Sequence, residues 1–273
     1  MKTLVMKFGG ASLETPAHFS QAAALIREKK ESDCRLVIVV SAMKGMTDQL
    51  LTLAESVSKA PPKREVDMLL SVGERVSMSL LAMALEKEGI PAISLTGSQS
   101  GIITCNRHSE ALIKEVRPTR IIEQLDQGKV VIVAGFQGVS TEKEITTLGR
   151  GGSDTTAVAL GVALGAKRVE FYKDVKGIYS EDPKKMEDAE LFRHLTFQQA
   201  LILSPKVLHE RAILLASKNG LPLHVISYCK TLRCSFPGTE VGGEALQEGP
   251  VYEVDDRDHR SPSREGSAGG YAF

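Results

Sequence analysis

Residues 146–166 read TTLGRGGSDTTAVALGVALGA, a stretch rich in glycine and hydroxyl side chains that runs into small apolar residues typical of a helix. Gly149, Gly151 and Gly152 allow positive φ angles and let backbone N–H groups approach a ligand closely. Ser153 or Asp154 is expected to cap the helix that follows. The helix start is a predicted anion site, because its N–H groups and dipole favour negative charge. An ordinary loop is the alternative, but it would require neither Arg150 nor paired glycines.

Strand-like and helix-like segments alternate on both sides of this stretch. Short apolar runs predict strands at 3–8, 35–40, 92–95, 129–134, 168–173 and 223–227. Apolar residues at helical spacing predict helices at 16–29, 48–58, 64–87, 119–127, 197–203 and 206–219. Residues 96–108 are expected to form a long polar binding loop, and 140–144 a hairpin tip. The alternation predicts an α/β fold, a three-layer αβα sandwich with a mostly parallel central sheet.

Length and composition are those of a globular protein, with 273 residues, 42% hydrophobic and 25% charged. We expect one folded domain over residues 1–240 and a disordered tail over 241–273, where the sequence becomes charged and then small and polar. Lys plus Arg and Asp plus Glu both number 34, so no net field favours nucleic acid. We expect no signal peptide and no membrane span, and scattered cysteines fit a reducing, cytoplasmic location.

The first predicted strand ends in a glycine turn beside a cation and a hydroxyl group. Lys7 ends the strand, Gly9 and Gly10 form the turn, and Ser12 follows. Exposed amides next to an ammonium group suit a phosphate. A plain tight turn between strand and helix is the alternative.

Other candidate residues follow the later strands. Ser41 and Thr47 come after the second strand, at the carboxyl edge where α/β proteins bind ligands, although both residue types also cap helices. Glu74 is either a ligand-binding acid or part of a solvated helix face. Asp174 and Tyr179 flank a glycine turn that suits a base or ribose pocket with a possible metal ligand, or merely forms a turn.

These features together indicate a site for a polyphosphate. Lys7, Arg150 and Lys206 supply cations near glycine-rich strand ends. No Gly-x-x-x-x-Gly-Lys-Ser/Thr loop occurs, and no Gly-x-Gly-x-x-Gly follows the first strand, which argues against a P-loop protein and a nicotinamide dehydrogenase. Phosphoryl transfer needs mostly positioned positive charge, which lysines, amides and magnesium can supply.

The motifs resemble those of the aspartate kinase catalytic domain, in the amino acid kinase superfamily. Residues 7–12 (KFGGAS) resemble its opening Lys-Phe-Gly-Gly-Thr-Ser, and 71–74 (SVGE) its Gly-Glu helix. Residues 147–155 resemble its Leu-Gly-Arg-Gly-Gly-Ser-Asp signature, and 174–183 (DVKGIYSEDP) its nucleotide loop. The resemblance covers residues 1 to about 240 with the motifs in the same order.

The resemblance implies an enzyme that transfers the ATP γ-phosphate to the β-carboxylate of L-aspartate, giving 4-phospho-L-aspartate for lysine and threonine biosynthesis. Lys7 would stabilise the moving phosphoryl group, and Asp154 would orient the lysine and the metal-bound phosphate. Arg150 would clamp the α-carboxylate of aspartate, and Glu74 would bind its ammonium group. No general base is needed, because a carboxylate is already ionised at neutral pH.

The implied site has a nucleotide side and an amino-acid side. The nucleotide side would contain Gly9, Gly10, Ser12, Ser153, Lys173, Asp174, Tyr179, Asp182 and Lys206. The amino-acid side would contain Ser41, Thr47, Glu74, Arg150, Gly151, Gly152 and Ser153. ATP and Mg²⁺ are the implied cofactors, with no residue assigned as a metal ligand, and a homodimer through the kinase domain is expected.

The sequence also departs from the family pattern. Ala11 replaces a threonine, Lys173 stands where threonine is usual, Glu210 replaces a proline, and the segment before Lys206 is about one helical turn shorter. Family members usually carry two ACT regulatory modules after the kinase domain, where about thirty tail-like residues stand here. We therefore expect a kinase that lysine and threonine do not inhibit through its own chain.

Two alternative functions are considered. A related kinase could phosphorylate glutamate, acetylglutamate or a nucleoside monophosphate, although Glu74 and Arg150 together favour a small zwitterionic amino acid. A catalytically weakened paralogue could instead bind nucleotide or a partner kinase as a regulatory or assembly subunit. The presence of Lys7, Arg150 and Asp154 argues against the second alternative.

Overall fold

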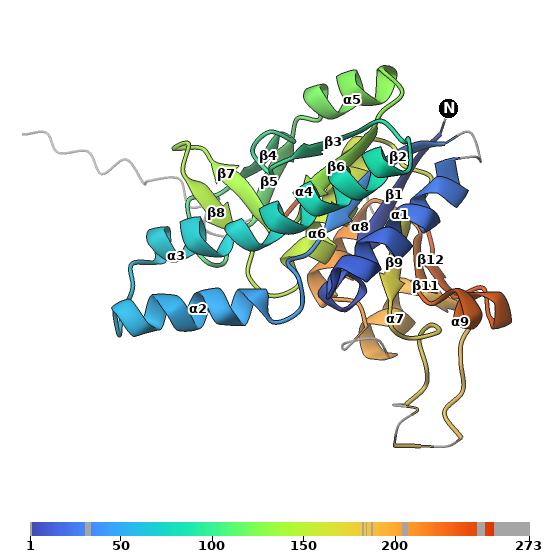
Figure 1. The fold of residues 1–273 in the computed structure, drawn as a ribbon. Helices are drawn as coiled ribbons and strands as arrows, with labels where there is room; N and C mark the ends of the chain where they lie inside the picture. Colours follow the sequence, from blue (N-terminus) through green and yellow to red (C-terminus); the bar gives the residue numbers. More distant parts are fainter. Residues whose placement is uncertain are drawn as a thin grey trace, which may run out of the picture.

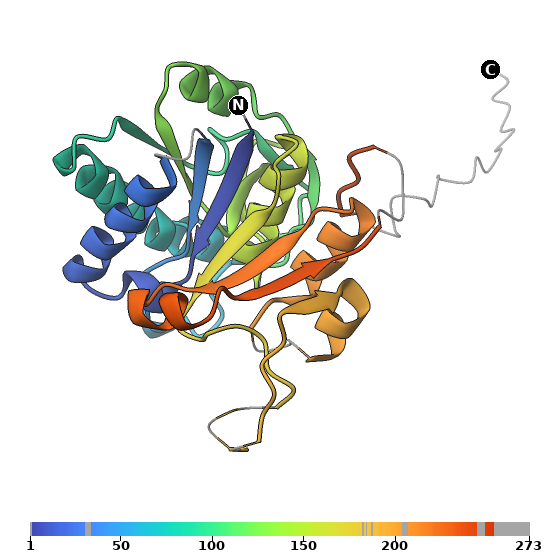
Figure 2. The ribbon, with the colours of Figure 1, turned by 90° about the vertical axis from the view of Figure 1, so that its right-hand side faces the viewer.

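The centre of the molecule is an eight-stranded sheet (Figure 1). The computed structural model describes residues 2–30, 34–181, 183, 185–186, 188–203, 207–244 and 249–253. In spatial order the strands are β10 (His194–Thr196), β12 (Thr239–Gly242), β11 (Leu223–Ser227), β9 (Val169–Lys173), β1 (Thr3–Phe8), β2 (Arg35–Val40), β6 (Val130–Ala134) and β3 (Ala92–Leu95). All pairs from β11 to β3 are parallel, whereas β12 runs antiparallel to β11. Figure 2 shows β2, β1, β9, β11 and β12 side by side.

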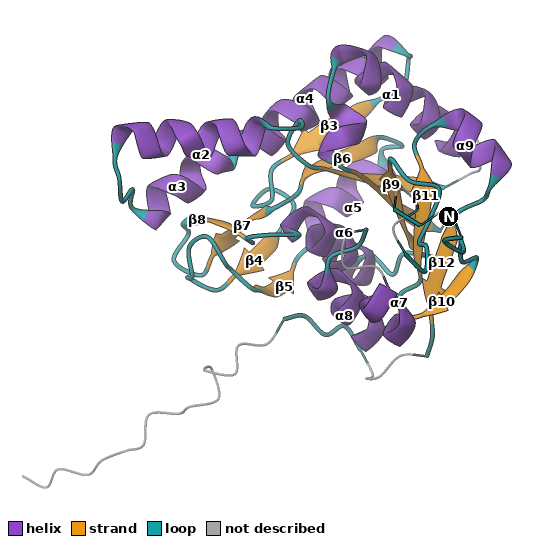
Figure 3. Ribbon diagram, turned by 90° about the horizontal axis from the view of Figure 1, so that it is seen from below, coloured by secondary structure: helices purple, strands orange, loops and turns teal. Residues whose placement is uncertain are grey.

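Helices cover both faces of this sheet (Figure 3). One face carries α1 (Pro16–Lys30), α4 (Val72–Lys87) and α9 (Lys230–Ser235), and the other carries α5 (Thr119–Asp126), α6 (Gly152–Ala163), α7 (Phe197–Leu203) and α8 (Glu210–Lys218). Strand side chains alternate between the faces. In β1, Met6 and Phe8 therefore join the core with α1 and α4, whereas Val5 joins the core with α6. The predicted three-layer sandwich is confirmed.

A second, four-stranded sheet lies beside the first. Its order is β5 (Ile113–Val116), β4 (Ile102–Thr104), β7 (Gln137–Ser140) and β8 (Ile145–Thr147). The hairpin tip predicted at 140–144 is confirmed by the antiparallel pairing of β7 with β8. The structureless loop predicted at 96–108 is wrong in part, because β4 lies within it and pairs with β7, which is distant in sequence. Near this sheet lie α2 (Met46–Val57) and α3 (Lys63–Leu70).

The helix predicted at 64–87 is two helices, α3 and α4, which meet at Ser71. The backbone carbonyl of Ser71 accepts a hydrogen bond from Gln137 Nε2 at 2.8 Å, which ties this junction to β7. By length and mean hydropathy, Lys63–Lys87 could cross a membrane, contrary to the expectation that no stretch is long enough. That is weak support for a membrane span, because α4 packs on the sheet with Leu81 and Leu85 fully buried.

The last described residues pack against the domain. Asn219 Oδ1 accepts a hydrogen bond from the Val251 amide at 2.8 Å, and Arg211 Nε lies 2.7 Å from Glu253 Oε1. Glu253 Oε2 also accepts a hydrogen bond from the amide of Ile113 at 2.9 Å, extending contacts to β5. The tail predicted from residue 241 therefore does not describe residues 249–253, and it stays a prediction for 254–273, which lie outside the described residues.

Candidate active site

The predicted site residues gather where the parallel strands end. Gly9 and Gly10 follow β1, Ser41 follows β2, and Lys173 ends β9. The first turn of α6 faces the same edge, since α6 packs on β1 and β9. This is the edge of an open α/β sheet at which ligands bind.

Two lysines and one carboxylate, Lys7, Lys173 and Asp154, lie at the middle of the site and are called the lysine centre below. Lys7 pairs in register with Phe171, so Lys173, two residues further along β9, points to the same face of the sheet as Lys7. That face is covered by α6, whose first turn carries Asp154. Lys7 Nζ lies 2.6 Å from Asp154 Oδ1, and Lys173 Nζ lies 3.2 Å from Asp154 Oδ2. Each carboxylate oxygen therefore has its own ammonium group.

Burial strengthens the electrostatic interactions among these charged groups. Lys7 is 5% exposed and Asp154 is 6% exposed. Burial opposes ionisation of Asp154, but Lys173 and Lys7 together outweigh it and hold the pKa of the carboxyl group well below its usual value. Burial also lowers the pKa of Lys7, an effect that Asp154 opposes and Lys173 reinforces. Two cations around one anion leave a net positive charge, which suits a phosphate.

The glycine-rich turn before α6 is shaped by contacts with other segments. Gly151 is the N-cap residue and has a φ of 71°, in the left-handed region. A Cβ atom there would lie 1.9 Å from His209 Cγ, so only glycine fits. The expectation that Ser153 or Asp154 caps the helix is wrong, because both lie within its first turn. Their position leaves the Asp154 side chain available for the two lysines.

The turn after β1 is equally close-packed. A Cβ atom on Gly10 would lie 2.9 Å from the carbonyl oxygen of Ala42, and one on Gly9 would lie 3.6 Å from Lys7 Nζ. Ser12 Oγ donates a hydrogen bond to the Gly9 carbonyl at 2.7 Å. The structure thus gives Ser12 a role in holding the turn.

Glu74 lies in the first turn of α4 and points toward the loop after β2. Its Oε1 accepts a hydrogen bond from the Ala42 amide at 3.0 Å. Its Oε2 is buried and has no hydrogen-bond partner among the described residues. Burial raises the pKa of Glu74 to about 7, although the Ala42 amide and Lys7 both favour the ionised form. A buried acid with one open oxygen is suited to a cationic ligand group.

The remaining predicted residues are less closely tied to this centre. Arg150 is exposed on the loop before α6, and Ser41 and Thr47 are half-buried. Asp174 is exposed, and Tyr179 forms a backbone bridge with Leu191 in the excursion between β9 and β10. Asp182 and Lys206 lie outside the described residues.

Sequence reasoning missed two residues that shape the site. His209 packs against Gly151, as described above. Asp67 in α3 is fully buried and binds the backbone of β8 just before the Arg150 loop. A carboxylate in a helical segment with several charges nearby normally faces solvent, so the sequence carried little signal for Asp67.

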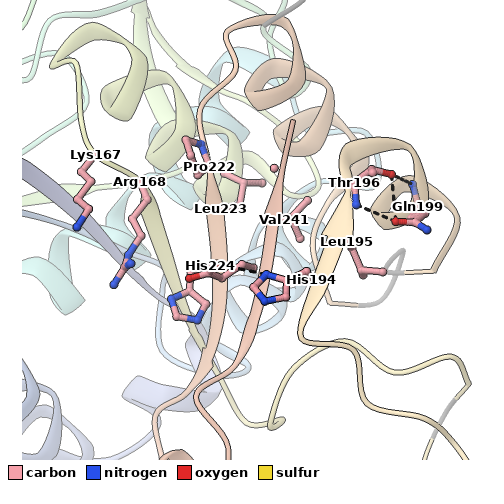
Figure 4. A pocket seen from close by; sticks show the side chains of 12 residues that line it. Lys167, Arg168, His194, Leu195, Thr196, Gln199, Pro222, Leu223, His224 and Val241 are labelled. Carbon is pink, nitrogen blue, oxygen red and sulfur yellow. Dashed lines mark hydrogen bonds and ion pairs between the residues drawn. The ribbon is translucent and has the colours of Figure 1, made fainter. Parts of the chain in front are cut away.

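A separate cavity of about 580 Å³ lies at the opposite end of the strands. Figure 4 shows Arg168, which precedes β9, together with His224 on β11 and His194 on β10. Lys173 ends the same strand that Arg168 precedes, so this cavity is distinct from the lysine centre. None of the predicted site residues that the structure describes lines it.

Comparison with known proteins agrees with the geometry. The model of the amino acid kinase family matches residues 2–227. An aspartokinase of Corynebacterium efficiens is 44% identical over 93% of this chain and 60% of its own length. The crystal structure of aspartate kinase from Synechocystis has a TM-score of 0.79 and 42% identity, covering 90% of this chain and 40% of that one.

A further solved structure is E. coli aspartokinase III in complex with aspartate and ADP. It has a TM-score of 0.79 and 25% identity, and the match covers 89% of this chain and 65% of that one. The chain described here spans about three fifths of the length of the curated relatives it matches.

Proposed function

The chain belongs to the amino acid kinase family, and we propose that it is the catalytic region of an aspartate kinase. It would transfer the γ-phosphate of ATP to the β-carboxylate of L-aspartate, giving 4-phospho-L-aspartate and ADP. The observation that carries this proposal is the arrangement of buried Lys7 and half-buried Lys173 on the two oxygens of buried Asp154. The aspartokinase names of relatives 44–46% identical to the chain support aspartate as the acceptor.

The lysine centre fits the needs of phosphoryl transfer. Lys7 and Lys173 would neutralise the charge that spreads over the oxygens of the moving group, and Asp154 would hold both ammonium groups in place. The dipole of α6 would add to this positive field. ATP would bind with Mg²⁺ on its phosphates. Phosphate oxygens and water would supply ligands to Mg²⁺. Among the described residues no three His, Cys, Asp or Glu side chains converge on a metal position.

The acceptor would bind between Glu74 and Arg150. The open Oε2 of Glu74 would accept a hydrogen bond from the aspartate ammonium group, and the Arg150 guanidinium would pair with the α-carboxylate. The β-carboxylate would then attack the γ-phosphorus as the bond to the β-phosphate oxygen breaks. No residue has to remove a proton, because the attacking carboxylate is ionised at neutral pH.

An acceptor-specificity assay tests this proposal. ADP release with magnesium ATP is coupled to pyruvate kinase and lactate dehydrogenase, with L-aspartate, L-glutamate, N-acetyl-L-glutamate and UMP as acceptors. We expect turnover with L-aspartate to exceed that with each other acceptor. Preferred turnover of another acceptor would assign the chain to a related kinase. Absence of turnover with all of them would favour the catalytically weakened paralogue.

Assembly and location stay predictions. Light scattering after gel filtration tests the expected homodimer. A cytoplasmic location is proposed from the biosynthetic role of an aspartate kinase.

A further inference from the structure

Asp67 is a buried carboxylate that joins three segments of the chain. It lies in α3 and is fully buried. Its Oδ1 accepts a hydrogen bond from Thr147 Oγ1 at 2.6 Å, and its Oδ2 accepts one from the Thr147 amide at 3.1 Å. The amide of Ser109 lies 3.0 and 3.1 Å from the two oxygens, and His108 Nδ1 lies 2.8 Å from Oδ2. One side chain therefore binds both β8 and the turn at 108–109.

The two segments that Asp67 binds support the loop that carries Arg150. Thr147 is the last residue of β8, three residues before Arg150. Ser109 has a φ of 70°, a strained value for a residue other than glycine, and it is held there by the Asp67 carboxylate. The Ser109 carbonyl oxygen packs 3.0 Å from the position that a Cβ atom on Gly149 would occupy. The turn at 108–109 thus packs beside the Gly149–Arg150 segment.

Arg150 itself gains little support from its own side chain, which is exposed. Its place is set by the backbone on either side. Gly151 rests on His209, and the Leu148 carbonyl accepts a hydrogen bond from Arg211. Asp67 adds an anchor at Thr147, whose backbone also pairs with β7 and accepts a hydrogen bond from the Ala111 amide. Loss of a buried hydrogen bond to a charged group would let this segment move, whereas the lysine centre on β1, β9 and α6 does not contact Asp67.

We propose that Asp67 is a positioning residue for acceptor binding: through Thr147 and the turn at 108–109 it sets where the Arg150 guanidinium meets the acceptor carboxylate. The inference rests on the proposed function and adds to it a residue that does not touch the substrate. We expect that weakening the contact with Asp67 raises the KM for the acceptor and leaves the KM for ATP nearly unchanged.

Two threonines in β8 provide a matched test. Thr147→Val removes the 2.6 Å hydrogen bond to Asp67 and keeps the shape of the side chain. Thr146→Val, the control, removes a hydrogen bond of the same length between Thr146 and Thr104, and both threonines at 146 and 147 are buried. Asp67→Asn is the stronger variant, because it removes the charge that all the donors share. Kinetics with L-aspartate and ATP are combined with hydrogen exchange of the 145–152 backbone.

We expect Thr147→Val to raise the KM for aspartate about tenfold, with the KM for ATP changed less than about twofold and faster exchange confined to 148–151. Asp67→Asn should do the same to a larger extent, and Thr146→Val should do neither. The inference is overturned if Thr147→Val matches Thr146→Val in both readouts. It is also overturned if both KM values rise together with faster exchange across the whole domain, since that result would show only a loss of stability.

Hydrogen exchange keeps this inference separate from the proposed function. If the wild-type chain does not phosphorylate aspartate, the proposed function fails. Exchange at 148–151 in the two valine variants then decides whether Asp67 positions the loop. Faster exchange in Thr147→Val alone supports the positioning role, and equal exchange in both variants overturns it.

Discussion

The candidate site has a donor side, where ATP is proposed to bind beside Lys7 and Lys173, and an acceptor side, where aspartate is proposed to bind between Glu74 and Arg150. The two sides differ in how their charges are compensated. On the donor side, Lys7 and Lys173 share the carboxylate of Asp154, so the buried ions already have partners in the free protein. On the acceptor side, Glu74 is buried with one oxygen without a partner among the described residues, and Arg150 is exposed. The donor side is organised before binding, whereas the acceptor side lacks the charges that a zwitterionic ligand would bring.

The largest expected effect comes from removing a cation from the donor side. Lys7→Met keeps most of the apolar stem but deletes the ammonium group 2.6 Å from Asp154. We expect kcat to fall by about 10³-fold, since a preorganised charge at the moving group acts mainly in the transition state. The KM for aspartate should change only a few-fold, because Lys7 lies on the donor side. Steady-state kinetics with both substrates measure the two effects.

The control for this prediction is Lys29→Met. Lys29 also forms an ion pair, with Glu170 at 3.0 Å, and it lies in α1 on the other face of the sheet. It should leave kcat within about twofold of the wild-type value. A Lys7 variant that keeps wild-type turnover would remove the lysine centre from the chemistry. Thermal melts of both variants show whether the chain is still folded.

Lys173 should contribute less than Lys7. It lies further from Asp154, at 3.2 Å, and its side chain is 18% exposed, so water screens it more. Lys173→Thr removes the ammonium group, and we expect kcat to fall about 10- to 100-fold. Lys173→Arg keeps the charge and should recover part of the loss. If Lys173→Thr has no effect on turnover, the second cation is dispensable and the comparison must rest on Lys7 alone.

Local sequence patterns account for the meeting of Lys7, Lys173 and Asp154. Strands β1 and β9 are short, buried and mostly apolar, and their parallel ends bring Lys7 and Lys173 to one edge of the sheet. Asp154 follows from the glycine-rich turn before a helix. These are local patterns, and alternation along the strands fixes which face each side chain occupies.

Contacts between distant segments were not predictable in the same way. The strands β4, β10 and β12 have three or four residues each, too few for a periodic pattern, and they depend on pairing with distant partners. The role of Asp67 depends on three segments that meet only in the folded chain. The open oxygen of Glu74 likewise results from the packing of α4 on the loop after β2.

The smallest expected effect is the pH dependence that Glu74 gives to the KM for aspartate, and its direction is well defined. Burial raises the pKa of this carboxyl group from 4.5 to about 7, so near neutral pH a part of the free protein carries it protonated. Under the proposed function, aspartate binds to the ionised form of Glu74, because only that form attracts the ammonium group. The KM for aspartate should therefore rise several-fold as pH falls from about 8 to about 6, while the KM for ATP should not follow.

Folding stability should change with pH in the opposite direction to the affinity for aspartate. Between about pH 4.5 and 7 the folded protein holds the Glu74 proton that the unfolded chain has released. Because the folded state then binds more protons, this residue's contribution to stability falls as pH rises through that window and is constant above it.

Glu74→Gln removes both trends. The KM for aspartate is raised at every pH and loses its dependence near pH 7, and the corresponding slope in the free energy of unfolding disappears. Glu86→Gln is the control, since Glu86 also lies in α4 and accepts a hydrogen bond from a backbone amide, that of Ala92, but is exposed. If Glu86→Gln flattened the pH profile as much as Glu74→Gln, or if both profiles kept the wild-type slope, Glu74 would not be the group that distinguishes the acceptor side from the compensated lysine centre.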